Sequence, residues 1–236
     1  MKETLVSKIS KSLTALALAG GFLASAQVQA AASLDNYLTD FEFGVPQELK
    51  VQSQAWYKPQ FGNAGWTHFS KWGQIKLKRG QTVSITVKTS VAGLYPGMSV
   101  WFRPQGKGFA PSNWYAGHSY HQYASIDTWN QIDQTTGTNL GRIKMDWVTN
   151  GFDTDGMKGT PTWNAAAEYP SNSSFNGISD GIPGSLTLSF KAKRSGLYQF
   201  VFAGINPDDK TATKPEDFSN NAMRHPVTVT VEKLLK

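Results

Sequence analysis

Residues 185–204 read SLTLSFKAKRSGLYQFVFAG, and this stretch decides the fold. Apolar and polar residues alternate in both halves, on either side of a Gly-containing turn at residues 193–196. Strict alternation flanking such a turn predicts a β-hairpin. The second half places Tyr198, Phe200 and Phe202 on one face. That aromatic surface is too large to leave in water, so we expect other strands to cover it.

The same pattern occurs earlier, at residues 74–88, where a basic-Gly turn again separates two alternating runs and predicts a second hairpin. Further strands are expected at residues 49–57, 98–102, 139–148 and 226–232, with residues 33–45 as a short helical turn or an entry arm. About seven to nine short strands predict an all-β fold, an antiparallel β-sandwich or jelly roll in one domain. Two stretches without regular patterning, residues 105–138 and 149–184, are expected to be long loops that carry function.

The first thirty residues have the parts of a secretory signal peptide. Three lysines precede a mostly apolar run at residues 13–23, and Val-Gln-Ala at residues 28–30 fits a small-x-small cleavage site. Cleavage after Ala30 or Ala32 is expected, leaving residues 31–236 as one β domain that is secreted, periplasmic or on the cell surface. The apolar run is too short for a membrane span, so no transmembrane segment is expected in the mature chain.

Charge and cysteine content exclude several classes of protein. The net charge is +6, of which the first thirty residues carry +2, so about +4 remains, and it is not gathered into a basic patch of the kind that binds nucleic acid. There are no cysteines, which excludes disulfides, blue copper, iron–sulfur clusters and thiol catalysis. Stability must therefore come from a core, which the aromatic residues can supply.

The motifs of the common hydrolases and nucleotide enzymes are missing from the sequence. There is no Gly-x-Ser-x-Gly, no His-Glu-x-x-His and no phosphate-binding Gly loop. A copper oxygenase with a histidine brace needs His at the mature N-terminus, where Ala31 or Ser33 would stand. We therefore expect a non-catalytic protein.

Four histidines are the scarcest polar side chains: His68, His118, His121 and His225. Neutral imidazole is the commonest metal ligand, and imidazoles with thioethers but no thiolates suit copper better than zinc. His118 and His121 lie in one irregular segment where both rings could turn to one point, and in an extended chain Trp66 would neighbour His68. The sequence therefore favours a copper site that draws on these loop histidines. The alternative is that each His is a surface residue or a hydrogen-bonded loop residue.

An exported, Cys-free, Trp-rich β protein with a Trp-x-His element at residues 66–68 and a distant second His resembles the secreted copper-binding proteins of methane-oxidising bacteria. In that family, two His and an oxidised Trp, converted to kynurenine, hold one copper ion. The resemblance implies Trp66 as the modified residue, His68 as one ligand and His118 or His121 as the other, with Trp129 as the alternative modified residue. It also implies copper capture or delivery outside the cytoplasm, alongside an exported redox protein or an outer-membrane component.

A glycan site is the rival interpretation. Trp114, Tyr120 and Trp129 lie in one irregular, aromatic-rich segment, and aromatic rings on β-sandwich loops stack on sugars. This interpretation makes the protein a carbohydrate-binding or adhesin-like module. The alternative is that these rings fold inward as a satellite core beneath a long loop.

A calcium site is the third possibility. Asp153 and Asp155 resemble part of an oxygen-ligand loop, but the EF-hand spacing fails, because Gly151 and Thr162 stand at the first and last ligand positions. The pattern favours solvated turn carboxylates, with structural calcium as the alternative.

Overall fold

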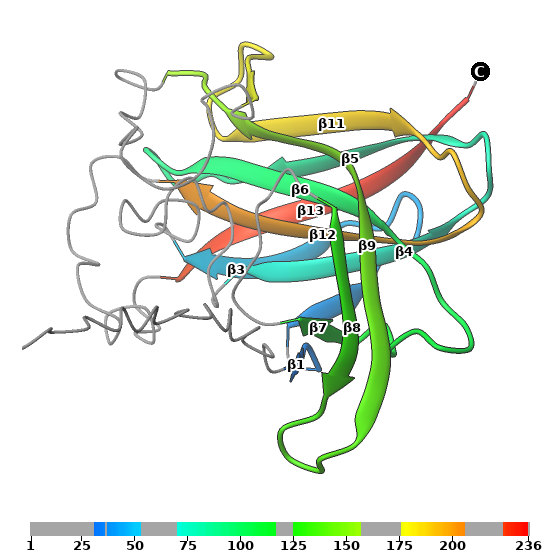
Figure 1. Cartoon of the computed structure of the whole chain (residues 1–236). Helices are drawn as coiled ribbons and strands as arrows, with labels where there is room; N and C mark the ends of the chain where they lie inside the picture. Colours follow the sequence, from blue (N-terminus) through cyan, green and yellow to red (C-terminus); the bar gives the residue numbers. More distant parts are fainter. Residues whose placement is uncertain are drawn as a thin grey trace, which may run out of the picture.

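The computed structural model describes residues 31–35, 37–52, 70–116, 125–156, 176–205 and 224–235. In these residues the chain forms thirteen strands and no helix, so none of this part offers a helix that could cross a membrane. Two sheets lie face to face, and a long hairpin projects beyond them (Figure 1). The predicted all-β, sandwich-like domain is confirmed.

The larger sheet has the order β10-β9-β6-β12-β4-β2, and β8 pairs with β9 outside this path. Its strands are β2 (Leu38–Asp40), β4 (Lys71–Leu77), β6 (Tyr95–Arg103), β8 (Ile126–Ile132), β9 (Asn139–Asp153), β10 (Gly177–Ile178) and β12 (Gly196–Ile205). The smaller sheet has the order β11-β5-β13-β3, formed by β3 (Gln47–Gln52), β5 (Thr82–Lys88), β11 (Ser185–Lys191) and β13 (Arg224–Leu234). A separate pair joins β1 (Ala31–Ser33) to β7 (Trp114–Ala116). All pairs are antiparallel except β2 with β4 and β10 with β9.

Both predicted hairpins are wrong in their pairing. β11 pairs with β5 in the smaller sheet, whereas β12 pairs with β4 and β6 in the larger one, so each basic-Gly turn carries the chain from one sheet to the other. The turn between β4 and β5 is hydrogen-bonded to the turn between β11 and β12. The Gly80 N–H donates to the Ala192 carbonyl at 2.8 Å, and the Ala192 N–H donates to the Gln81 carbonyl at 2.8 Å. Alternation reports which face of a strand is buried, but it does not report which strand lies beside it.

The space between the sheets is filled by what we call the inner core. Tyr198, Phe200 and Phe202 of β12 point into it, and the Phe200 ring lies 5.1 Å from that of Phe41. Aliphatic residues of the smaller sheet close it from the other side, among them Val83, Ile85, Val87, Leu186, Leu188, Val227, Val229 and Val231. The aromatic face is therefore covered as the sequence required.

The other face of the larger sheet carries a second cluster, which we call the outer core. It consists of Ala31, Leu34, Trp72, Trp101, Ala110, Tyr115, Ile126, Ile143, Met145 and Val201. The Trp72 ring stacks on those of Trp101 and Tyr115, with centroids 5.8 and 6.2 Å apart. Buried Arg103 of β6 ties the β7 segment to the sheet by donating to the carbonyls of Pro111 and Trp114 at 3.1 and 2.7 Å.

The predicted long loops are partly strand. Residues 105–138 contain β7 and β8, and residues 149–184 contain the end of β9 and β10. β8 was missed because its register shifts between Thr128 and Gln131, which breaks the period-two pattern. β9 is fifteen residues long and continues to Asp153, past the predicted end at residue 148.

Gly73 offers a test of inner-core packing. A Cβ atom at this position would lie 2.3 Å from the Phe200 ring and 2.7 Å from the Phe41 ring. We expect Gly73→Ala to reduce the free energy of unfolding by about 1–3 kcal/mol, because the rings must shift. Urea unfolding measures it, with exposed Lys76→Ala on the same strand as a control expected to stay within about 0.5 kcal/mol of wild type. Equal unfolding midpoints for the two variants would contradict this packing.

Candidate metal centre

The predicted copper ligands, His68, His118 and His121, and the predicted modified residue, Trp66, lie outside the described residues. The structure does describe the strand ends to which these segments are attached. His68 precedes Ser70 and β4, His118 follows the end of β7 at Ala116, and His121 precedes Ser125 and β8.

These three attachment points meet at the outer core. Trp72, four residues after His68, stacks on Tyr115, three residues before His118. Ile126, five residues after His121, belongs to the same buried cluster. The two chain segments that carry the predicted ligands, residues 53–69 and 117–124, are therefore attached at one place on the outer face of the larger sheet.

A second convergence occurs at one end of the sandwich, where the strand ends flanking residues 53–69, 157–175 and 206–223 lie together (Figure 1). The register pairs that place them there are Gln52 with Arg224, Lys71 with Phe202, and Phe152 with both Gly97 and Gly177. The segment that contains Trp66 and His68 therefore begins and ends at this edge of both sheets.

His225 is the one histidine within the described residues. It is half-buried near the start of β13 and pairs with Val51 of β3, at the end of the sandwich just described. Within the described part of the chain, no group of three or more His, Asp or Glu side chains is close enough to hold a metal ion. These residues alone therefore do not complete a metal centre.

The carboxylates of Asp153 and Asp155 accept hydrogen bonds from backbone N–H groups and hold the local backbone in place. Asp153 is fully buried, and its two oxygens accept the N–H groups of Gly184 at 2.6 Å and Asp155 at 2.8 Å. Asp155 accepts the Ser179 hydroxyl and the N–H groups of Asp180, Gly181 and Ile182 at 2.8, 2.7 and 3.1 Å. The expectation of solvated carboxylates is therefore wrong for Asp153. Protein donors hold the oxygens that calcium would need, and nothing here supports a calcium site.

The environments of the two carboxylates shift their pKa values in opposite directions. Burial raises the pKa of Asp153 to about 6, against the opposing effect of its two N–H donors. The hydrogen bond from Ser179 lowers the pKa of Asp155, and the three backbone N–H groups act in the same direction. One corner thus holds a carboxyl that gains a proton easily beside one that resists protonation.

Because folding raises the pKa of Asp153, this group stabilises the fold most below about pH 4, and that contribution is lost as the pH rises to about 6. We expect Asp153→Asn to flatten this part of the stability profile by at most about 3 kcal/mol, since one pKa unit corresponds to about 1.4 kcal/mol. Urea midpoints between pH 4 and 7 measure it. Asp155→Asn is the matched control, and its effect should instead fall below about pH 4. A variant profile parallel to wild type between pH 4 and 6 would refute the assignment.

Of the three aromatic residues expected at a glycan site, the structure describes two, Trp114 and Trp129. Trp114 of β7 is half-buried against the outer core, as the satellite-core alternative expects. Trp129 of β8 has 62% of its surface exposed, and Tyr120 lies outside the described residues.

Residues 29–212 match the family described as copper(I)-binding protein, CorA-like. The chain belongs to this family. Among solved structures, CorA of Methylomicrobium album BG8, a surface-associated copper-binding protein important in copper acquisition, is 34% identical, with a TM-score of 0.67 over 84% of this chain and 98% of CorA. The secreted protein MopE of Methylococcus capsulatus shares the fold at 19% identity, with a TM-score of 0.57 over 83% of this chain and 87% of MopE. The suspected resemblance is thereby confirmed, while a comparison with curated protein sequences found no match.

Proposed function

We propose that this member of the CorA-like family binds Cu(I) outside the cytoplasm and serves copper acquisition. Its ligands in this proposal are His68 with His118 or His121, beside Trp66. The observation that carries the proposal is the family match, which spans all four residues. CorA, the 34% identical relative, is itself described as important in copper acquisition.

The positions of the strand ends support this ligand set. A chain extends by at most about 3.6 Å per residue. The Cα atom of His68 therefore lies within about 14 Å of the Cα atom of Trp72, and the Cα atom of His118 lies within about 11 Å of that of Tyr115. The Trp72 and Tyr115 rings stack on each other. Only a few residues connect each histidine to this stacked pair, so both imidazoles stay close to a common point. That proximity lowers the entropy cost of assembling a site.

The chemistry of the available donors supports copper in the Cu(I) state. Soft ligands favour Cu(I), and in a chain without cysteine these are imidazoles and thioethers. An oxidised tryptophan is said to facilitate copper binding in MopE. Trp66, two residues from His68, is our candidate for that role, whereas Trp129 lies on β8 with its ring 4.0 Å from the Arg142 guanidinium.

The fold also supports export with cleavage after Ala30. Ala31 begins β1 and is buried, and β1 pairs along its whole length with β7. Cleavage after Ala32 would remove two of the three residues of this strand. We therefore propose Ala31 as the mature N-terminus and, by analogy with surface-associated CorA, a location at the cell surface.

Replacing ligands tests the proposal. We expect His68→Ala, and the double variant with His118→Ala and His121→Ala, to weaken Cu(I) binding by more than about 100-fold, beyond the loss typical of groups outside the ligand sphere. Competition with a chromogenic Cu(I) chelator measures it. The matched control is His225→Ala, which removes a histidine outside the proposed site.

The thermal transition of the metal-free variants should match that of wild type, because the proposal assigns these histidines to the metal and not to the packing of the fold. Unchanged Cu(I) affinity in both ligand variants, or a loss confined to His225→Ala, would refute the ligand assignment. Intact mass of protein from its native medium tests Trp66: an oxidative mass increase that maps to Trp66 supports its modification, and an unmodified mass rejects it.

A further inference from the structure

The geometry points to a second binding site, for a saccharide, on the open ring face of Trp129 in the β8–β9 hairpin. This hairpin extends beyond the sandwich (Figure 1). The Arg142 guanidinium covers one face of the Trp129 ring, 4.0 Å from its centroid. Because 62% of the residue is nevertheless exposed, the opposite face of the ring is open to solvent.

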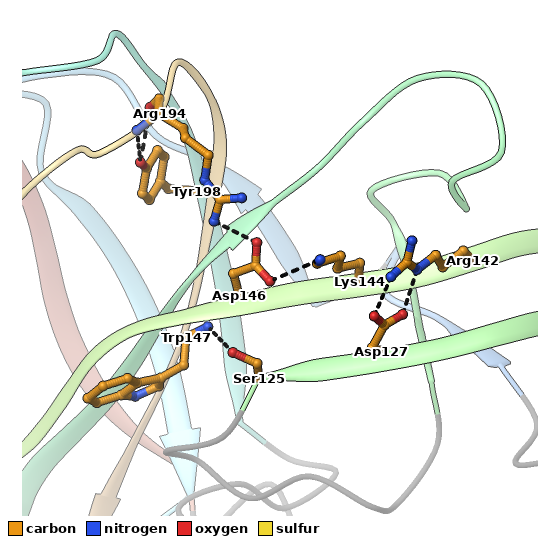
Figure 2. Close-up of polar contacts among 8 residues, drawn as sticks. All are labelled: Ser125, Asp127, Arg142, Lys144, Asp146, Trp147, Arg194 and Tyr198. Atoms are coloured by element: carbon orange, nitrogen blue, oxygen red, sulfur yellow. Dashed lines mark hydrogen bonds and ion pairs between the residues drawn. The ribbon is translucent and has the colours of Figure 1, made fainter.

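Trp129 is held rigidly rather than left as a loose surface residue. Arg142 is fixed by a bidentate pair with Asp127, in which its Nε donates to Oδ1 at 2.5 Å and one terminal nitrogen donates to Oδ2 (Figure 2). The backbone of Arg142 is also held. Its backbone N–H donates to the Gly108 carbonyl, and the Arg142 carbonyl accepts from the Ala110 N–H, both at 2.9 Å. The guanidinium also lies 5.9 Å from the Phe109 ring. The Arg142 guanidinium therefore contacts the Trp129 ring closely and also lies within cation–π range of Phe109.

The backbone is distorted at this position. Asn130 has a φ of 52°, the one positive value at a non-Gly residue in the described chain. It lies in the irregularity between Thr128 and Gln131, and buried Gln131 donates its amide N–H to the Trp129 carbonyl at 3.2 Å. Bulges of this kind re-aim a side chain and are frequent beside binding sites. A left-handed residue costs stability, and such strain clusters at functional positions.

The groups around the ring indicate what it binds. Asp127, paired with the Arg142 guanidinium that covers the ring, and Asn130, the residue after Trp129, are both exposed, and the Asn139 amide donates to the Asn130 side-chain oxygen at 3.5 Å. A pyranose ring presents a flat C–H face for stacking and hydroxyls at its rim for such acceptors and donors. Arg142 is already paired with Asp127, so it offers no free cation to a phosphate or an anionic lipid. A neutral polysaccharide is therefore the partner that fits.

Affinity electrophoresis through gels containing laminarin, xylan, galactomannan or dextran, with pull-down on cellulose, tests this inference. We expect wild type to be retained by at least one of these, and Trp129→Ala to bind about tenfold more weakly, as the loss of one stacked ring implies. Trp147→Ala, which removes another exposed tryptophan on β9, is the matched control and should bind like wild type.

Arg142→Lys keeps the charge but loses the bidentate fork, so it should weaken retention without removing the ring. Thermal unfolding of each variant shows that the fold is intact. No retention of wild type on any polysaccharide overturns the inference, as does equal retention of Trp129→Ala and wild type. Binding to phosphatidylcholine vesicles that depends on Trp129, with no polysaccharide retention, would assign the ring to a lipid surface and overturn it as well.

Discussion

The structure depends on the burial of β12 from both sides. Every residue from Leu197 to Gly204 is buried, so this strand has no face that can meet water. Its aromatic side chains require the smaller sheet on one side, and Val201 with Gln199 requires a cover on the other. Gln199 is satisfied by the Ser112 carbonyl at 2.6 Å, a backbone group of the covering segment. One strand thereby specifies two layers of packing.

The cover on the outer face connects the scaffold to the proposed copper centre. The segments that carry His68, His118 and His121 are attached where β4, β7 and β8 meet the stacked pair of Trp72 and Tyr115. Rigid aromatic packing beside a ligand-bearing segment favours a precise site, because a close-packed cluster moves little when an ion binds.

The sequence predicted the composition of the sheets better than their connections. Strand 82–88 was placed correctly, and the inward face of β12 was identified from its aromatic spacing. The pairing of β11 with β12 was predicted wrongly, because their alternation fits two facing sheets as well as one hairpin. β8 was missed, because a bulge at Asn130 breaks its period. For the site, a Trp-x-His element and loop histidines led to the right family, but the meeting of their strand ends needed tertiary contacts.

The two hydrogen-bonded turns that join the sheets have a consequence for folding during synthesis. Arg79 donates to the Ser195 hydroxyl across 116 residues of sequence, and β4 and β5 find their partners β12 and β11 only in the last quarter of the chain. Such distant pairing slows folding, because long loops must close before any contact rewards them. A chain emerging from the ribosome cannot complete the larger sheet before β12, which ends at Ile205, or the smaller sheet before β13, which ends at Leu234. The topology thus delays the final packing of both layers until nearly the whole polypeptide has been made.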